Sequence, residues 1–201
     1  MSLYPKIIND LITSFCELPG IGRKAAERFV FYLIKQDAKQ IELFAQNLQL
    51  LKQNNFICPT CFNFSESAGR CNVCLDNKRD KNIICVVESF YDLNVIDATA
   101  EYNGLYHVLG GKIDPPEGIT PDKLKIAELV QRIKQENIQE VILALNPDLA
   151  GEGTIIHLKN ILKPLNVKLT LLARGLPMGA NIEYADEATI SNALKGRREI
   201  I

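Results

Sequence analysis

Hydrophobic residues recur at helical spacing through the first 54 residues of the chain. The first series consists of Ile7, Ile8, Leu11, Ile12 and Phe15. A second series follows a Gly-x-Gly break and consists of Ala25, Ala26, Phe29, Val30 and Leu33. A third consists of Ile41, Phe44, Leu48 and Leu51. Spacings of three and four residues place each series on one helix face, so residues 1–54 are predicted to form a helical module.

The hydrophobic pattern changes from residue 82 onward. Short apolar runs at residues 83–87, 106–109, 141–145 and 167–172 are typical of buried strands. Helical stretches near residues 90–100, 121–137 and 153–165 separate them, and a short helix is expected near 186–194. This alternation predicts an α/β fold in which helices cover both faces of a parallel sheet.

Composition and charge narrow the function classes. Of 201 residues, 47% are hydrophobic and 23% are charged, which is ordinary for a globular protein. No apolar run reaches the ~18 residues that a membrane helix needs. The first residues lack the basic-then-apolar order of a secretory signal, so we expect a cytoplasmic protein. Because the net charge is only −1, any contact with nucleic acid has to come from local basic patches.

The break between the first two helices has the sequence Leu-Pro-Gly-Ile-Gly-Arg-Lys-Ala-Ala, at residues 18–26. Gly20 and Gly22 let the backbone adopt positive φ and approach a ligand closely. A helix that begins near Gly22 points free N–H groups outward, and such groups favour the binding of a phosphate. Arg23 lies beside the turn, and Lys24 and Arg28 share a helix face. The string predicts a helix–hairpin–helix that binds the DNA backbone without reading sequence. The alternative is an ordinary helical hairpin.

Four of the six cysteines form two Cys-x-x-Cys pairs. They are Cys58, Cys61, Cys71 and Cys74. Two such pairs suit tetrahedral coordination of one structural zinc ion per chain, with no open position for a catalytic water. An iron–sulfur cluster and a redox dithiol are the alternatives. The intervening segment has too little apolar content for a core of its own, so the metal would support folding. Cys16 and Cys85 lie among apolar residues and are interpreted as core thiols.

Acidic and amide residues follow two of the predicted strands. Glu88 follows the first strand, and Asn146, Asp148 and Glu152 follow the third. The arrangement resembles the Toprim domain of topoisomerases, primases and some nucleases, where a glutamate and an Asp-x-Asp hold Mg²⁺. In this chain Asn146 stands at the first aspartate position. A neutral amide weakens a site for a hard cation, so Glu88, Asp148 and Glu152 could bind Mg²⁺ only weakly. They could instead form an acidic rim that contacts a basic partner.

The order of these modules, with the strings at residues 109–115, 173–177 and 183–187, resembles the RecR family of bacterial recombination mediators along nearly the whole chain. The boundaries we expect are 1–54 for the helix–hairpin–helix, 55–78 for a zinc finger with four cysteine ligands, 82–178 for the Toprim domain and 179–201 for a C-terminal helical tail.

The resemblance implies a non-enzymatic, nucleoid-associated protein. It would form a ring-shaped homotetramer on single- and double-stranded DNA and act with RecO and RecF to load RecA during recombinational repair. The alternatives are a Mg²⁺-dependent Toprim nuclease or topoisomerase-like enzyme, and a zinc module that contacts only proteins.

Two further features carry less functional information. His107 and His157 are the two histidines, and neither belongs to a local catalytic pattern, so both are expected to be structural. The basic run at residues 195–198 could contact phosphate or could be a solvated tail.

Overall fold

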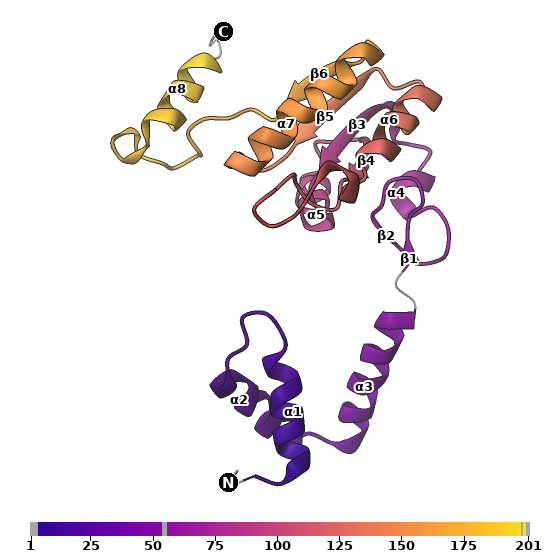
Figure 1. The fold of residues 1–201 in the computed structure, drawn as a ribbon, viewed down its shortest axis with the longest axis vertical. Helices are drawn as coiled ribbons and strands as arrows, with labels where there is room; N and C mark the ends of the chain where they lie inside the picture. The colour runs from indigo at the N-terminus through magenta and orange to yellow at the C-terminus, as the bar shows by residue number, and fades with distance from the viewer. Residues whose placement is uncertain (1–3, 54–55, 198, 200–201) are drawn as a thin grey trace. The chain divides into compact units, whose positions relative to one another are not determined.

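The computed structural model describes residues 4–53, 56–197 and 199, and it divides into two compact units, Met1–Asn55 and Phe56–Ile201 (Figure 1). The first unit is helical, and the second contains the cysteine cluster, a parallel sheet with helices, and a C-terminal helix. The α/β fold class and its modules are confirmed. The four domain boundaries remain predictions. Among the described residues, no helix is long and apolar enough to cross a lipid bilayer.

Three helices form the N-terminal unit: α1 (Lys6–Cys16), α2 (Arg23–Ile34) and α3 (Ala38–Gln53). The small core between α1 and α2 consists of Ile12, Ala26 and Val30, with Ile8, Phe15 and Ile21 packed against it. The α3 helix contributes no buried residue, although it carries the apolar series predicted for it. The helical periodicity therefore located all three helices but did not reveal how little of α3 is buried.

A short module containing the cysteines opens the second unit. Strands β1 (Phe56–Ile57) and β2 (Phe64–Ser65) pair antiparallel, and the one-turn helix α4 (Asn72–Leu75) follows.

The sheet has the strand order β4-β3-β5-β6, and all its pairs are parallel. Its strands are β3 (Asp80–Val87), β4 (Gly104–Val108), β5 (Glu140–Ala144) and β6 (Lys168–Leu171). Its helices are α5 (Phe90–Ala98), α6 (Ile126–Gln135) and α7 (Leu149–Leu162). Because β3 and β5 are neighbours in register, their carboxyl ends lie side by side. This adjacency brings together the polar residues that follow each strand.

Alternate residues of the central strand point to opposite faces of the sheet. Ile84 and Val86 join the larger core with residues of α6 and α7, whereas Cys85 and Val87 join a second core with Leu93 of α5. Phe62 and Val73 of the cysteine module pack against this second core. Both faces are therefore covered, as expected, and the cysteine module supplies part of the cover on one face.

Two expected helices differ in extent. The stretch at residues 121–137 is split into a 3₁₀ turn, η1 (Pro121–Lys123), and α6, because Leu124 is extended and its buried side chain enters the larger core. Helix α7 begins at Leu149, four residues earlier than expected. Its start is set by Asp148, whose carboxylate accepts a hydrogen bond from the N–H of Gly151 at 2.9 Å.

The chain after α7 is mostly short turns. A 3₁₀ turn, η2 (Lys163–Leu165), precedes β6, and η3 (Ile182–Tyr184) precedes the last helix, α8 (Glu187–Lys195). Asp186 caps α8 by accepting a hydrogen bond from the N–H of Thr189 at 2.9 Å. The short helix expected in the tail is therefore present.

Candidate functional site

The turn between α1 and α2 exposes the amino end of α2. Gly20 has a φ of +78°, a conformation that favours glycine. Gly22 is extended, with a φ of −82°, so it is not required by backbone conformation. A Cβ atom at either glycine would meet open space. No side chain caps the amino end of α2, and its first turn contains no acidic residue. The turn therefore leaves backbone N–H groups available to an anion.

The three predicted basic residues differ in their surroundings. Lys24 and Arg28 are exposed, lie four residues apart on α2, and form no ion pair within the described part of the chain. Arg23 instead pairs with Glu27, Nε to Oε1 at 3.2 Å. The i,i+4 spacing of Arg23 and Glu27 could have indicated this pair. Lys24 and Arg28 thus provide the charge that is free to meet a phosphate.

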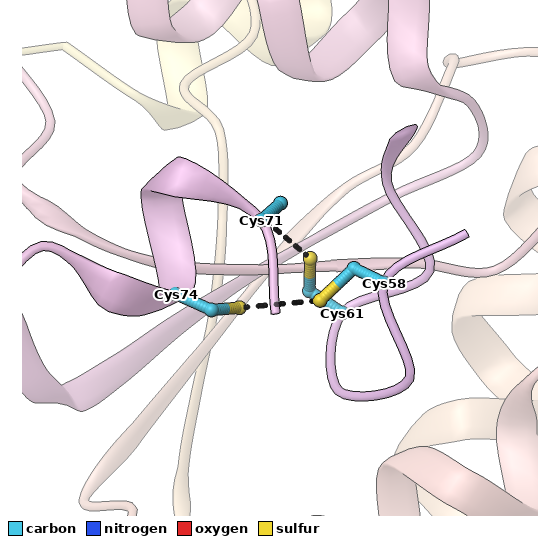
Figure 2. Close-up of side chains that lie close together, drawn as sticks. All are labelled: Cys58, Cys61, Cys71 and Cys74. Atoms are coloured by element: carbon cyan, nitrogen blue, oxygen red, sulfur yellow. Dashed lines mark hydrogen bonds between the residues drawn. The ribbon is translucent and has the colours of Figure 1, made fainter. Parts of the chain in front are cut away.

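The four predicted cysteines meet in one cluster (Figure 2), and their sulfur atoms all lie within 4.8 Å of one another. The Cys61–Cys71 sulfur pair is 3.4 Å apart and the Cys58–Cys74 pair is 3.9 Å apart. A tetrahedral ion with metal–sulfur bonds of about 2.3 Å needs sulfurs about 3.8 Å apart, so the cluster fits one metal ion. Cys58, Cys61 and Cys71 are buried, which leaves little access for a substrate.

A strained turn arranges the first pair of cysteines. Phe62, directly after Cys61, has a φ of +63°, and its N–H donates to the Cys58 carbonyl at 3.0 Å. A non-glycine residue in this conformation is held there by its surroundings.

Close contact between thiols also controls their ionisation. The hydrogen bond between Cys61 and Cys71 lowers the pKa of the Cys71 thiol to about 2 and raises the pKa of the Cys61 thiol. One thiolate is thus stabilised by its neighbours' protons, and a divalent cation could take the place of those protons.

The cysteine module is attached to the edge of the sheet. The N–H of Val108, at the end of edge strand β4, donates to the carbonyl of Cys61 at 2.8 Å. The Phe62 ring meets the ring of His107 edge-on, with centroids 5.3 Å apart.

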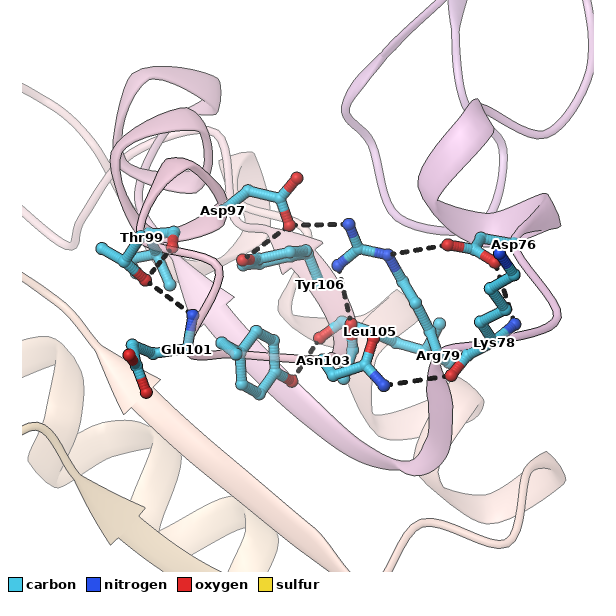
Figure 3. Close-up of polar contacts among 12 residues, drawn as sticks. Asp76, Lys78, Arg79, Asp97, Thr99, Glu101, Asn103, Leu105 and Tyr106 are labelled. Carbon is cyan, nitrogen blue, oxygen red and sulfur yellow. Dashed lines mark hydrogen bonds and ion pairs between the residues drawn. The ribbon is translucent and has the colours of Figure 1, made fainter.

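A second attachment joins the segment after α4 to β4 and α5 (Figure 3). Arg79 donates from Nη2 to Asp97 at 2.7 Å and from Nη1 to the Gly104 carbonyl at 3.2 Å. The Tyr106 hydroxyl also donates to Asp97, at 3.2 Å. These contacts therefore couple the folding of the cysteine module to the folding of the sheet.

Glu88 and Asn146 meet at the carboxyl ends of β3 and β5. The backbone N–H of Asn146 donates to Glu88 Oε1 at 2.6 Å, and its side-chain amide donates to Oε2 at 2.9 Å. Glu88 is only 8% exposed. Both carboxylate oxygens thus accept bonds from the residue that replaces the first aspartate of the Toprim pattern. An ionised aspartate could not donate the second of these bonds.

The other two predicted acids each form an ion pair. Asp148 pairs with Lys112, and Glu152 pairs with Arg174. The hydrogen bond from Lys112 is the main reason that the pKa of Asp148 is lowered. Glu88, Asp148 and Glu152 do not form a three-ligand cluster, because among the described residues the four cysteines are the one group of three or more whose ligand atoms lie close enough to share an ion. Protein cations therefore neutralise Asp148 and Glu152, whereas Glu88 is hydrogen-bonded by the neutral Asn146.

Sequence reasoning missed the roles of Lys112 and Arg174, and also that of Gly151. Lys112 and Arg174 lie within strings that carry the family resemblance, but nothing in those strings indicates their partners. A Cβ atom at Gly151 would lie 1.9 Å from the Asn146 carbonyl oxygen, so glycine lets the loop after β5 pack against α7.

The remaining sequence interpretations have mixed outcomes. Cys85 is buried as expected, but the interpretation of Cys16 as a core thiol is wrong, because the core between α1 and α2 is too small to cover it. His107 is buried and its Nε2 is 2.7 Å from the Lys125 carbonyl, as expected of a structural histidine. Arg198, in the basic run, lies outside the described residues.

Comparisons with known proteins agree with this arrangement of modules. Three family models match: "RecR, helix-hairpin-helix" at residues 8–51, "Toprim domain" at 82–173, and "RecR, C-terminal" at 175–198. The cysteine cluster lies between the first two matches.

Similar curated proteins match over nearly their full length, and each is called Recombination protein RecR. The protein from Chloroherpeton thalassium is 44% identical over 198 residues, covering 96% of this chain and 97% of the relative. The protein from Rubrobacter xylanophilus is 42% identical over 200 residues, covering all of both chains. The protein from Myxococcus xanthus is 40% identical over 196 residues, covering 98% of this chain and 99% of the relative. Because identities of 40–44% extend over nearly the whole of each chain, the protein belongs to the RecR family.

Proposed function

We propose that this protein is a non-catalytic DNA-binding mediator of recombinational repair. The observation that carries the proposal is the uncapped amino end of α2, flanked by the exposed and unpaired Lys24 and Arg28. Backbone N–H groups and two neighbouring cations suit successive phosphates of one strand. Such contacts hold DNA regardless of its sequence and of whether it is single- or double-stranded.

The cysteine cluster is proposed to hold one structural zinc ion per chain. Cys58, Cys61, Cys71 and Cys74 would supply all four ligands as thiolates, and an ion coordinated in this way has no position for water or substrate. Its proposed role is to fix the cysteine module to the edge of the sheet through the bond between Val108 and Cys61.

The absence of catalysis is proposed from the state of the acidic residues. A metal-dependent nuclease needs carboxylates that converge on Mg²⁺ and a group or water to attack the phosphate. Here Glu88 accepts hydrogen bonds from Asn146, and Asp148 pairs with Lys112. A cation would have to displace Lys112 to reach Asp148, which makes Mg²⁺ binding weak at best.

The wider assembly is proposed from the family resemblance. We propose a ring-shaped homotetramer that acts with RecO and RecF, in the cytoplasm at the nucleoid, to load RecA onto single-stranded DNA. The names of the relatives, Recombination protein RecR, support a role in recombination.

A DNA-binding titration tests the core of the proposal. The double variant Lys24→Ala/Arg28→Ala should bind DNA more weakly, and the slope of log K against log salt should fall by roughly one to two. The matched control is Lys35→Ala/Lys39→Ala, which removes the same charge from exposed positions at the other end of α2 and the start of α3. If both double variants lose equal affinity, the contact is diffuse and the hairpin assignment is wrong.

The same preparations test for catalysis. Supercoiled and gapped DNA incubated with the protein and Mg²⁺ or Mn²⁺ should show a mobility shift without cleavage or relaxation. Metal-dependent nicking by the wild type that is lost in Glu88→Ala would establish the nuclease alternative instead.

A further inference from the structure

Three aromatic rings, two of them exposed, form a row where the cysteine module meets α5. Phe64 of β2 contacts Phe90 at a centroid distance of 4.5 Å, and Phe90 contacts Tyr91 at 4.0 Å. Phe64 is 42% exposed and Tyr91 is 68% exposed. We call Phe64, Phe90 and Tyr91 the aromatic row. Large rings are costly to leave in water, and exposed aromatic rings beside an apolar groove are typical of binding surfaces.

The aromatic row continues into a groove. Val95 lies one helical turn after Tyr91 and is 70% exposed. It lines a groove of about 310 Å³ between α5 and the ends of β5 and β6. Other residues that line the groove include Ile96, Leu145, Leu172 and Ala173. The row and the groove together offer an extended apolar track along one side of α5.

Two carboxylates beside the track have no cationic partner among the described residues. Asp92 lines the groove, and its carboxylate accepts hydrogen bonds from the N–H and hydroxyl of Ser89. Glu66, two residues after Phe64, accepts one hydrogen bond from Asn72 at 3.2 Å. Neither acid takes part in an ion pair in the described part of the chain, whereas Arg174, the cation that lines the groove, already pairs with Glu152. Glu66 and Asp92 therefore place negative charge beside the track that no ion pair in the described part of the chain offsets.

We propose that this track binds an extended segment of another protein that carries an arginine next to an apolar residue. The guanidinium can stack on the exposed Tyr91 ring while it hydrogen-bonds to a neighbouring carboxylate. The apolar residue then enters the groove beside Val95. Nucleic acid fits this surface poorly, because its phosphates would meet Glu66 and Asp92, and Arg174 in the groove already pairs with Glu152. The inference is independent of DNA binding by the hairpin and goes beyond the proposed function.

Peptide selection on the full-length protein tests the proposal. The probe is a random nonapeptide library displayed on phage, selected on the wild type and counter-selected on Tyr91→Ala. Selected peptides should be enriched in arginine with an adjacent apolar residue. The best of them, titrated by fluorescence anisotropy, should bind Tyr91→Ala at least tenfold more weakly than the wild type, and Tyr91→Phe nearly as well as the wild type.

Two controls separate binding from folding and from general charge. Tyr184→Ala removes another exposed tyrosine, from η3, and should leave peptide affinity unchanged. Glu66→Lys should weaken binding, while Glu117→Lys, on an exposed loop, should not. Metal content and circular dichroism of each variant confirm that the fold is intact.

The outcomes that would overturn the proposal are specific. Selection that yields no arginine-rich peptides, or peptides that bind Tyr91→Ala as well as the wild type, would show that the track is not the binding surface. A change in sedimentation velocity caused by Tyr91→Ala would show instead that the track is an interface between copies of this chain.

Discussion

Removing the proposed metal ion from the cysteine cluster should weaken the sheet as well as the cysteine module. Part of the coupling passes through three contacts that join Phe62 or Cys61 to the rest of the second unit. These are the Val108–Cys61 backbone hydrogen bond, the edge contact of Phe62 with His107, and the Lys125 ammonium 5.1 Å from the Phe62 ring centroid. Each contact contributes about 1 kcal/mol. When the module unfolds without its metal, the sheet therefore loses about 3 kcal/mol.

Chelation followed by thermal unfolding measures this effect. A loss of about 3 kcal/mol should lower the Tm of a unit of this size by about 6–12 °C. Hydrogen exchange should locate the change, with faster exchange along β4 and little change in β6 at the opposite edge. Cys74→Ser should reproduce the loss, whereas Cys16→Ser, which alters an exposed thiol outside the cluster, should leave metal content and Tm unchanged. Equal β4 protection with and without metal would refute the coupling, and a well-folded wild type isolated without metal would refute the metal site.

Three further predictions follow from single residues. In urea unfolding, Gly151→Ala should destabilise the protein by several kcal/mol, because its Cβ would lie 1.9 Å from a backbone oxygen. The control Gly153→Ala, whose Cβ would meet open space on the same helix, should stabilise the protein by up to about 1 kcal/mol. Burial lowers the pKa of His107 to about 4, so the unfolded chain binds a proton there that the folded chain does not. Stability should therefore fall by about 3 kcal/mol as the pH falls from about 6.5 to 4, and His107→Gln should flatten that dependence. Asn146→Asp should lower stability by about 1–3 kcal/mol, because it removes a hydrogen-bond donor to Glu88 and adds a like charge beside it. Millimolar Mg²⁺ should raise the Tm of this variant but not that of the wild type.

Regular patterns in the sequence located most of the fold. The apolar runs at β3 and β5 are buried on both sides, which makes them continuous and easy to recognise. The four cysteines were equally easy to recognise as a metal-binding pattern, because two Cys-x-x-Cys pairs have few uses other than metal binding. The starts and breaks of helices were less predictable. Asp148 stands out in the sequence as a site residue, although its local role is to cap α7.

Contacts between distant parts of the chain could not be predicted in this way. Lys112 and Asp148 are separated by 36 residues, and Arg174 and Glu152 by 22. Their pairing depends on where the fold brings two distant segments together, and no local period encodes it. The exposure of Cys16 has a similar origin, because it depends on how small the core of the N-terminal unit is, and periodicity does not report the size of a core.

The acidic site illustrates how a change of one residue alters what a fold can do. The carboxyl ends of β3 and β5 bring Glu88 and the loop at Asn146 together whatever residues they carry. With an aspartate at 146, two carboxylates would face each other, and the repulsion could be relieved only by a proton or a bound cation. With asparagine, the amide satisfies Glu88 directly, and Lys112 neutralises Asp148. A side-chain ammonium cannot leave when the metal concentration falls, nor can it polarise a phosphate as a divalent ion does. The loops thus keep a fixed shape without a metal, as the proposed non-catalytic role requires.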